Sequence, residues 1–232
     1  MESADAATFD ESYYARYYFD KKTKVADPQH VERLGAFVSS YLEYLRVPVR
    51  RVLDVGCGVG LWRDIVARHF PQASYQGVEI SEYLCGRYGW ERGSVVDYQA
   101  REPFDFVICQ GVLAYLSPVD LKRALRNLGT LSHGALYVEA VTLEDYENDI
   151  VDEDLTDPLL FRHRAEMYRR GLSRKFKDSV LRAFVLGEDQ DATVQLVVVH
   201  GQLVPDESEM SIACRRLSVS LGRHLKVHDT AL

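Results

Sequence analysis

The chain has 232 residues, 47% of them hydrophobic and 27% charged, a balance typical of a globular protein that buries a sizeable core. Its formal net charge of -7 argues against a nucleic-acid partner, because phosphate binding requires a basic surface. No apolar run is long enough to cross a bilayer, so we expect no membrane partner. Residues 1–12 lack the basic and apolar parts of a secretory signal, so the sequence predicts a cytoplasmic protein.

The cysteines are expected to be reduced thiols. No C-x-x-C pair and no mixed cysteine and histidine ligand spacing is present. Disulfides and structural metal sites depend on such patterns, so we expect neither, and no metal. The residues concerned are Cys57, Cys85, Cys109 and Cys214.

Two helices are predicted before the first strand. Residues 9–25, FDESYYARYYFDKKTKV, carry aromatic side chains at helical spacings. A second helix is expected over residues 27–46, with Asp27 as N-cap and Pro28 at the first helical position. The apolar side of this second helix consists of Val31, Leu34, Phe37, Val38, Tyr41, Leu42 and Leu45.

From residue 51 onward, strand and helix patterns alternate, which predicts an α/β fold with a parallel sheet and helices on both faces. Strands are expected at residues 51–56, 74–81, 93–98, 104–111, 135–142, 179–188 and 192–201. Helices are expected at residues 61–70, 83–88, 117–132 (capped by Ser117 or Asp120) and 157–171. The turn at residues 189–191 joins the last two strands into an antiparallel hairpin, giving a mostly parallel seven-stranded sheet.

Three units follow from these patterns. Residues 1–48 are interpreted as a helical lid and residues 49–204 as the α/β core. Residues 205–232 form a polar tail to which we assign no structure.

The stretch VLDVGCGVG, from Val52 to Gly60, places three glycines between a predicted strand and a predicted helix. Such a loop lets a ligand approach the backbone and the N-terminus of the helix. No lysine follows Gly60, which excludes a nucleoside triphosphate loop, and the third glycine comes one residue too early for a dinucleotide loop. Asp54 suits a ligand ammonium group better than a pyrophosphate, and S-adenosylmethionine (SAM) carries an ammonium and no phosphate.

The segment DVGCGVG, Asp54–Gly60, resembles the first glycine motif of class I SAM-dependent methyltransferases, which have a Rossmann-like fold. The resemblance extends in element order over residues 49–201. It implies that Glu79 binds the ribose hydroxyls and that Asp97 accepts from the adenine amino group with Val96 on the ring. The segment CQGVLAYL, Cys109–Leu116, resembles the family segment after the fourth strand, which implies that Cys109 and Gln110 lie near the methionine moiety and that residues 112–115 open towards the substrate. The cofactor contacts implied are Asp54, Gly56, Cys57, Gly58, Gly60, Glu79, Ile80, Val96, Asp97, Cys109 and Gln110.

The aromatic N-terminal segment has two interpretations. Most of its rings suit a stripe that faces the core. The resemblance also implies a lid over the cofactor, in which at least one of Tyr13, Tyr14 and Tyr18 contacts cofactor or substrate, with Tyr14 and Tyr18 as the expected cofactor contacts. Tyrosine ring faces suit a sulfonium, and such a lid would exclude water.

Methyl transfer from a sulfonium needs proximity and in-line orientation, and it needs a base only where the acceptor loses a proton. Position in the predicted fold makes Tyr115, Glu139 and His163 the candidates for a catalytic role, although His163 also suits a plain surface position. No [DNS]-P-P-[YFW] motif follows the fourth strand, which argues against amino methylation of bases or glutamine.

The sequence therefore predicts a SAM-dependent methyltransferase that acts on an O, N or C atom of a small-molecule acceptor, as a monomer or homodimer. A protein or RNA methyltransferase is an alternative, with the basic run at residues 162–177 as docking face. The acidic run at residues 145–157 offsets that charge, so two solvated surfaces are the simpler interpretation. A methyltransferase-fold partner without catalysis is a further alternative, and the acceptor stays open.

Overall fold

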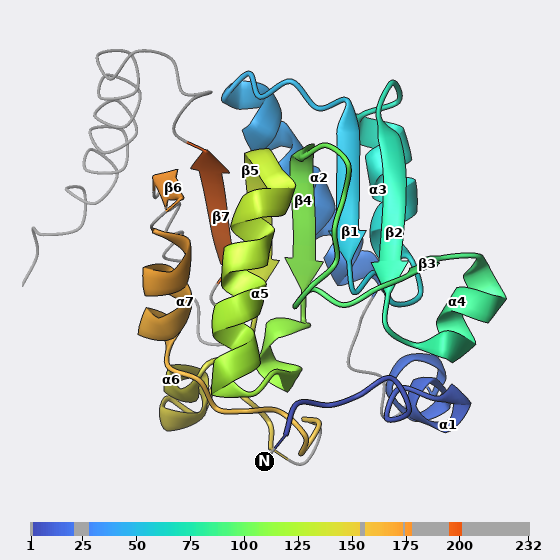
Figure 1. Ribbon diagram of the computed structural model, residues 1–232, viewed down its shortest axis with the longest axis vertical. Helices are drawn as coiled ribbons and strands as arrows, with labels where there is room; N and C mark the ends of the chain where they lie inside the picture. Colours follow the sequence, from blue (N-terminus) through green and yellow to red (C-terminus); the bar gives the residue numbers. More distant parts are fainter. Residues whose placement is uncertain (1, 21–27, 154–155, 174, 178–194, 201–232) are drawn as a thin grey trace, which may run out of the picture.

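A single sheet of seven strands, in the order β3-β2-β1-β4-β5-β7-β6, forms the centre of the computed structural model (Figure 1). The structure describes residues 2–20, 28–153, 156–173, 175–177 and 195–200. The strands are β1 (Arg51–Val55), β2 (Ser74–Glu79), β3 (Glu91–Arg92), β4 (Phe104–Gln110), β5 (Ser132–Glu139), β6 (Phe176–Lys177) and β7 (Gln195–His200).

The first five strands run parallel and confirm the α/β prediction. β1 pairs in parallel with both β2 and β4, β2 with β3, and β4 with β5. β7 is antiparallel to β5 and to β6. The strand order reverses between β1 and β4, and in such sheets ligands bind beyond the carboxyl ends of the strands at that point.

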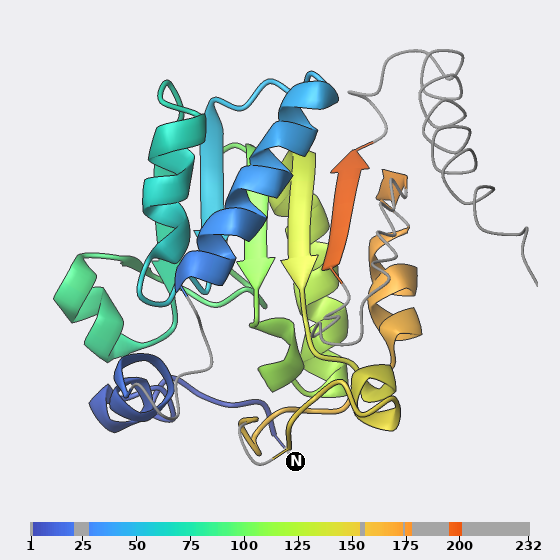
Figure 2. The same cartoon turned by 180° about the vertical axis from the view of Figure 1, so that it is seen from behind.

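Helices cover both faces of the sheet, as Figures 1 and 2 show. One face carries α2 (Pro28–Tyr44) and α3 (Leu61–His69), and the other carries α5 (Pro118–Leu131) and α7 (Ala165–Leu172). The shorter elements are α1 (Glu11–Tyr14), η1 (Ala15–Phe19), α4 (Glu82–Tyr88), η2 (Leu113–Tyr115) and α6 (Leu143–Glu147).

Each central strand is buried on both sides, because successive side chains point to opposite faces of a sheet. In β4, Phe106 and Ile108 pack toward α2 and α3, whereas Val107 and Cys109 pack toward α5. This explains the continuous apolar run at the fourth predicted strand.

The helix expected over residues 27–46 is confirmed as α2, which packs on the sheet together with α3. Val31, Leu34, Val38 and Leu42 are buried on its inner side, whereas Phe37 is 44% exposed. The proposed cap Asp27 lies outside the described residues.

The single helix expected over residues 9–25 is wrong in detail. Asp10 caps a four-residue helix, α1, which passes into the π-helical turn η1 and ends at Phe19. This segment lies across the carboxyl ends of the strands next to α4 (Figures 1 and 2). Phe9 and Tyr14 pack there with Leu84 of α4, so burial of aromatic rings sets the local conformation.

Two predicted boundaries also need correction. The third strand ends at Arg92 and not at residue 98, because the carbonyl of Ser94 accepts hydrogen bonds from the backbone N–H groups of Asp97 and Tyr98 and makes a turn. The helix expected from residue 157 begins only at Ala165. Residues 157–160 form a turn instead, in which the Leu160 N–H donates to the Asp157 carbonyl at 3.3 Å, and the Phe161 N–H then donates to the Ala114 carbonyl at 2.7 Å.

The helix expected at residues 117–132 is confirmed as α5, with Ser117 as its N-cap. The last predicted strand coincides with β7, while the strand at residues 179–188, the hairpin turn and the tail from residue 205 lie outside the described residues. Within the described part of the chain, no helix has the length and apolarity that a bilayer crossing requires.

Candidate active site

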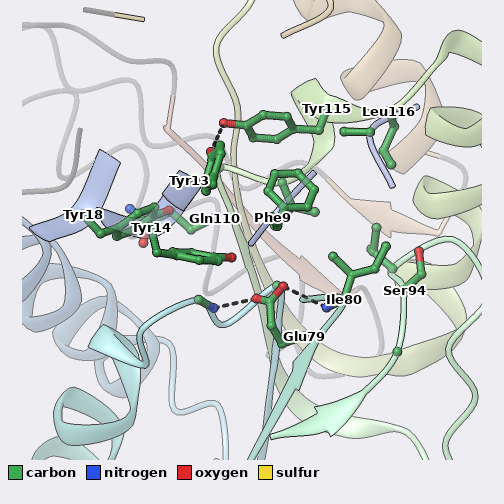
Figure 3. Close-up of a pocket in the computed structure, with 17 residues that line it drawn as sticks. Phe9, Tyr13, Tyr14, Tyr18, Glu79, Ile80, Ser94, Gln110, Tyr115 and Leu116 are labelled. Atoms are coloured by element: carbon green, nitrogen blue, oxygen red, sulfur yellow. Dashed lines mark hydrogen bonds between the residues drawn. The ribbon is translucent and has the colours of Figure 1, made fainter. Parts of the chain in front are cut away.

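A cavity of about 650 Å³, including its open mouth, lies beyond the carboxyl ends of β1, β2 and β4 (Figure 3). Its walls come from the glycine loop after β1, the end of β2, the turn after β3, the segment after β4 and the N-terminal aromatic segment. Its lining is mostly apolar and aromatic with a few polar groups such as Glu79 and Gln110, which is the usual composition of a small-molecule site.

The glycine loop adopts a backbone that side-chain-bearing residues avoid. Gly56, Gly58 and Gly60 have φ values of 73°, 52° and 80°. A Cβ on Gly56 would overlap Val112, and one on Gly60 would lie 2.7 Å from the Trp90 ring. A Cβ on Gly58 would meet no described atom within 4 Å, although Gly58 lines the cavity. The loop thus leaves open backbone where a ligand can approach closely.

Glu79 connects this loop to the end of β2. Its carboxylate accepts hydrogen bonds from the backbone N–H groups of Gly58 and Ile80, each at 2.8 Å, and of Ser81 at 3.0 Å (Figure 3). The residue is only 4% exposed, and burial raises the pKa of its carboxyl. Glu79 lines the cavity, where carboxylate lone pairs suit the hydroxyl groups of a sugar.

Asp54 lies beneath the loop and outside the cavity lining. It is 2% exposed, and the hydroxyl of Tyr75 donates to its Oδ2 at 2.7 Å. Burial raises the pKa of Asp54 to about 7, Tyr75 opposes this, and the charge of Glu79 adds to it. Cys57 and Gly60 are likewise outside the lining, so Gly56 and Gly58 are the loop residues that face the cavity.

The raised pKa of Asp54 gives a testable dependence of stability on pH. A carboxyl whose folded pKa is raised stabilises the fold when protonated, and that contribution is lost as pH rises from about 4 to about 7. Between pH 5 and pH 8, which include about two units of this range, we expect the wild type to lose about 3 kcal/mol of unfolding free energy relative to Asp54→Asn. Urea unfolding of both proteins at pH 5 and pH 8 measures it, with the exposed Asp64→Asn as control. Parallel profiles for Asp54→Asn and wild type would contradict the assignment.

Trp90 is a residue that sequence reasoning missed. Its indole N–H donates to the Gly58 carbonyl at 2.9 Å, and its ring lies against Gly60 and Gly77. It therefore holds the glycine loop from outside. The sequence carries no signal for this role, because Trp90 follows a helix and stands 30 residues after the loop.

The turn after β3 contributes differently from the prediction. Gly93, Ser94 and Val95 line the cavity, whereas Val96 is half-buried outside it and Asp97 is exposed. Because the strand ends earlier than expected, the residues that reach the cavity also come earlier in the sequence. Gly93 and Ser94 follow the strand directly, and this glycine–serine pair is the local indication of a turn at the place where a strand was expected.

Gln110, at the end of β4, lines the cavity and is held at both ends of its amide. The Trp62 indole N–H donates to its Oε1 at 2.7 Å, and its Nε2 donates to Glu139 at 3.2 Å. Tyr137 also donates to Glu139, at 2.7 Å. Glu139 thus orients Gln110 and lies outside the lining, and Cys109 is fully buried in the sheet.

Five aromatic residues close the cavity, and Tyr14 and Tyr18 are among them as expected. The others are Phe9, Tyr13 and Tyr115. The hydroxyls of Tyr13 and Tyr115 are 2.8 Å apart, and Tyr115 donates to Asp157 at 3.0 Å. The sequence makes Tyr13 a candidate contact and places Asp157 at the start of a helix, but it does not predict their hydrogen bonds with Tyr115, because only folding brings these segments together.

His163 is buried and therefore not at the surface, and it lies outside the cavity lining beside Leu116, which does line the cavity. It is 4% exposed, and its Nε2 lies 2.8 Å from the Leu116 carbonyl. A carbonyl only accepts, so this nitrogen carries the proton. Its ring stacks on Phe161 with centroids 5.6 Å apart. His163 therefore fastens the segment before α7 to the segment after β4.

Comparison with known proteins agrees with this geometry. Residues 13–179 match a family model described as "Methyltransferase domain". The chain is 31% identical over 91 residues to trans-aconitate 2-methyltransferase of Pseudomonas paraeruginosa, and 32% identical over 77 residues to malonyl-[acyl-carrier protein] O-methyltransferase of Legionella pneumophila. These matches cover 36% and 32% of this chain and 33% and 26% of the two enzymes.

A similar solved structure is magnesium protoporphyrin IX methyltransferase from Synechocystis PCC 6803 with bound S-adenosylhomocysteine (SAH). It has a TM-score of 0.62 at 18% identity, and the match covers 84% of this chain and 98% of that one. A SAM-dependent methyltransferase from Clostridium acetobutylicum matches with a TM-score of 0.57 at 11% identity, over 81% and 97% of the two chains. These likenesses show the fold.

The parallel sheet, the glycine loop and the cavity define a Rossmann-like methyltransferase fold. The chain belongs to the class I SAM-dependent methyltransferases, a family that uses SAM as methyl donor.

Proposed function

We propose that this chain transfers the methyl group of SAM to a small-molecule acceptor. The observation that carries the proposal is the link between the open backbone of Gly58 and the buried carboxylate of Glu79, which together face an aromatic cavity. A carboxylate and exposed backbone at this place suit a nucleoside that lacks phosphate.

The lining fits SAM along its length. Glu79 would accept hydrogen bonds from the ribose hydroxyls, and the backbone at residues 93–95 would border the adenine. Gln110 and the loop backbone at Gly56 would face the methionine moiety. When bound, SAM supplies an electrophilic methyl group on a sulfonium, whose charge suits the faces of the surrounding tyrosine rings.

The chain's own contribution is mainly binding, orientation and exclusion of water. Burial strongly raises the pKa of Tyr115, so its hydroxyl stays protonated at neutral pH and does not serve as a free base. We therefore assign Tyr115 a positioning role. Glu139 acts through Gln110, and His163 stays structural.

Support for a small acceptor comes from the curated relative named for trans-aconitate, and a second relative is named for malonyl-[acyl-carrier protein]. The chain spans about a third or less of those enzymes, so their acceptors are not carried over. The basic run is a poor docking face for RNA, because Arg162, Arg164 and Arg170 are paired with glutamates in the described structure.

Calorimetric titration with SAM, SAH and NAD tests the proposal. We expect SAM and SAH to bind and NAD not to bind. At a SAH concentration of about 100 times its dissociation constant, the free energy of unfolding should rise by about 2.7 kcal/mol. Folded protein that binds NAD, or that binds neither sulfur nucleoside, would overturn the proposed function.

A further inference from the structure

A chain of hydrogen bonds closes one end of the cavity. Tyr13 comes from the N-terminal segment, Tyr115 from the segment after β4, and Asp157 from the stretch before α7. The Tyr13 and Tyr115 oxygens are 2.8 Å apart, and Tyr115 reaches Asp157 Oδ2 at 3.0 Å. Figure 3 shows the tyrosine pair at the end of the cavity away from Glu79. If Glu79 holds the ribose, this end is available to the acceptor.

The direction of these hydrogen bonds follows from the carboxylate. Asp157 is 5% exposed, and its Oδ1 accepts from the backbone N–H of Leu159 at 2.9 Å. Tyr115 donates to Asp157 Oδ2 at 3.0 Å, and this bond uses its single hydroxyl proton. The bond between the two tyrosines must then be made by the proton of Tyr13. Burial raises the pKa of both tyrosines, so both protons stay in place at neutral pH.

Tyr13 lines the cavity, and the remaining lone pair of its phenolic oxygen is a hydrogen-bond acceptor, because its own proton is committed to Tyr115. A ligand group placed there gains a hydrogen bond only if it brings an N–H or O–H. A carboxylate brings none and would place its lone pairs against those of Tyr13, which leaves a buried polar group unpaired.

The side chains around Tyr13 also favour a ligand with an N–H or O–H group over a carboxylate. Phe9 packs edge-on against both Tyr13 and Tyr115, with ring centroids 5.0 and 5.2 Å apart. These rings form an apolar wall beside the Tyr13 hydroxyl. No lysine, arginine or histidine among the described residues lines the cavity, whereas Glu79 does. An anionic ligand meets no countercharge from this lining.

We propose that this end of the cavity is the acceptor subsite and that it selects alcohols, phenols or amines over carboxylates. The proposal rests on the proposed function and narrows its acceptor class. The proposed acceptor class differs from that of the relative named for trans-aconitate, because trans-aconitate is a carboxylate.

Three probes of one shape test this on the SAH-saturated protein: benzyl alcohol, benzylamine and benzoate. Their dissociation constants are measured by NMR titration. We expect the wild type to bind the alcohol and the amine at least about tenfold more tightly than benzoate, the difference that one hydrogen bond of about 1.4 kcal/mol makes. Tyr13→Phe should remove most of this preference while SAH binding persists.

Asp157→Asn gives a sharper test, because it should reverse the direction of both hydrogen bonds, from Tyr13 to Tyr115 and from Tyr115 to residue 157. The Leu159 N–H still donates a hydrogen bond to the side-chain oxygen of the asparagine, as it does to Asp157 Oδ1. The amide Nδ2 of the asparagine then faces Tyr115 and donates to its hydroxyl oxygen. Tyr115 then donates to Tyr13, and Tyr13 donates to the cavity. We expect benzoate to gain affinity and benzyl alcohol and benzylamine not to gain, relative to wild type. If Asp157 had only a structural role, its replacement would weaken the binding of all three probes to the same extent.

The outcomes separate this inference from the proposed function. If SAH fails to bind, the proposed function is overturned first. If SAH binds but benzoate equals or exceeds the donors in the wild type, or no donor probe binds, the acceptor class is wrong and the proposed function stands. A uniform loss in Asp157→Asn also overturns the acceptor class.

Discussion

Replacing Glu79 by glutamine is expected to weaken SAH binding by about 10-fold to 150-fold. Glu79 faces the cavity with a buried carboxylate, and hydrogen bonds to a charged group contribute about 1.5–3 kcal/mol each. The amide also turns an NH₂ group toward backbone N–H donors that the carboxylate now satisfies. Both effects act on the nucleoside, so calorimetric titration with SAH measures them together.

Glu82→Gln is the matched control, because Glu82 begins α4 three residues further on and is exposed. Its ion pair with Arg92 lies at the surface and contributes little. We expect its SAH affinity to stay within about twofold of wild type. Urea unfolding must show that Glu79→Gln is folded. A folded Glu79→Gln protein with wild-type affinity would remove Glu79 from the cofactor site.

Replacing Gly56 by alanine is expected to lower the free energy of unfolding by about 2–4 kcal/mol. Its φ of 73° disfavours any Cβ by about 1–2 kcal/mol, and the new methyl group would overlap Val112. For a chain of this size, each kcal/mol lowers the melting temperature by about 2–4 °C. Thermal unfolding with and without SAH measures both the fold and the site.

Two further variants separate the causes. Gly56→Ala combined with Val112→Ala removes the overlap and should regain only part of the loss, because the backbone strain remains. Gly86→Ala is the control: Gly86 lies in α4 with ordinary φ and open space at its Cβ. Alanine there should stabilise the chain by up to about 1 kcal/mol. If alanine lowered the free energy of unfolding equally at Gly56 and Gly86, the backbone conformation of the glycine loop would not be the cause of the loss at Gly56.

The prediction of Asp97 as a cofactor contact shows where local reasoning stops. An aspartate after a strand is a natural candidate for a ligand contact, but the strand ends at Arg92 and the turn that follows directs Asp97 to solvent. The pairing of β3 with β2 involves only residues 91–92, and no local pattern marks so short a strand. A shift of a few residues was enough to bring Ser94 to the cavity instead.

The tyrosines show the opposite case. Their helical spacing indicated a packed aromatic segment, and five aromatic residues do line the cavity. The spacing of the tyrosines does not predict which of their hydroxyl groups form hydrogen bonds with one another. The partner of Tyr13 is 102 positions away, and the partner of Tyr115 is 42 positions away.

The sequence by itself determined the alternation of strands and helices, the parallel core of the sheet, the glycine loop and the cofactor class. Each strand, each helix and the glycine loop depends on local backbone preference and periodicity, whereas the parallel sheet and the cofactor class depend on the order of these elements and on the resemblance over residues 49–201. Only the tertiary structure decided that Trp90 holds the loop, that Asp54 lies beneath it, and that Asp157 orders the hydroxyls at the far end of the cavity. Those relations are made by side chains from separate elements, and the packing of whole layers determines which of them come within hydrogen-bond distance.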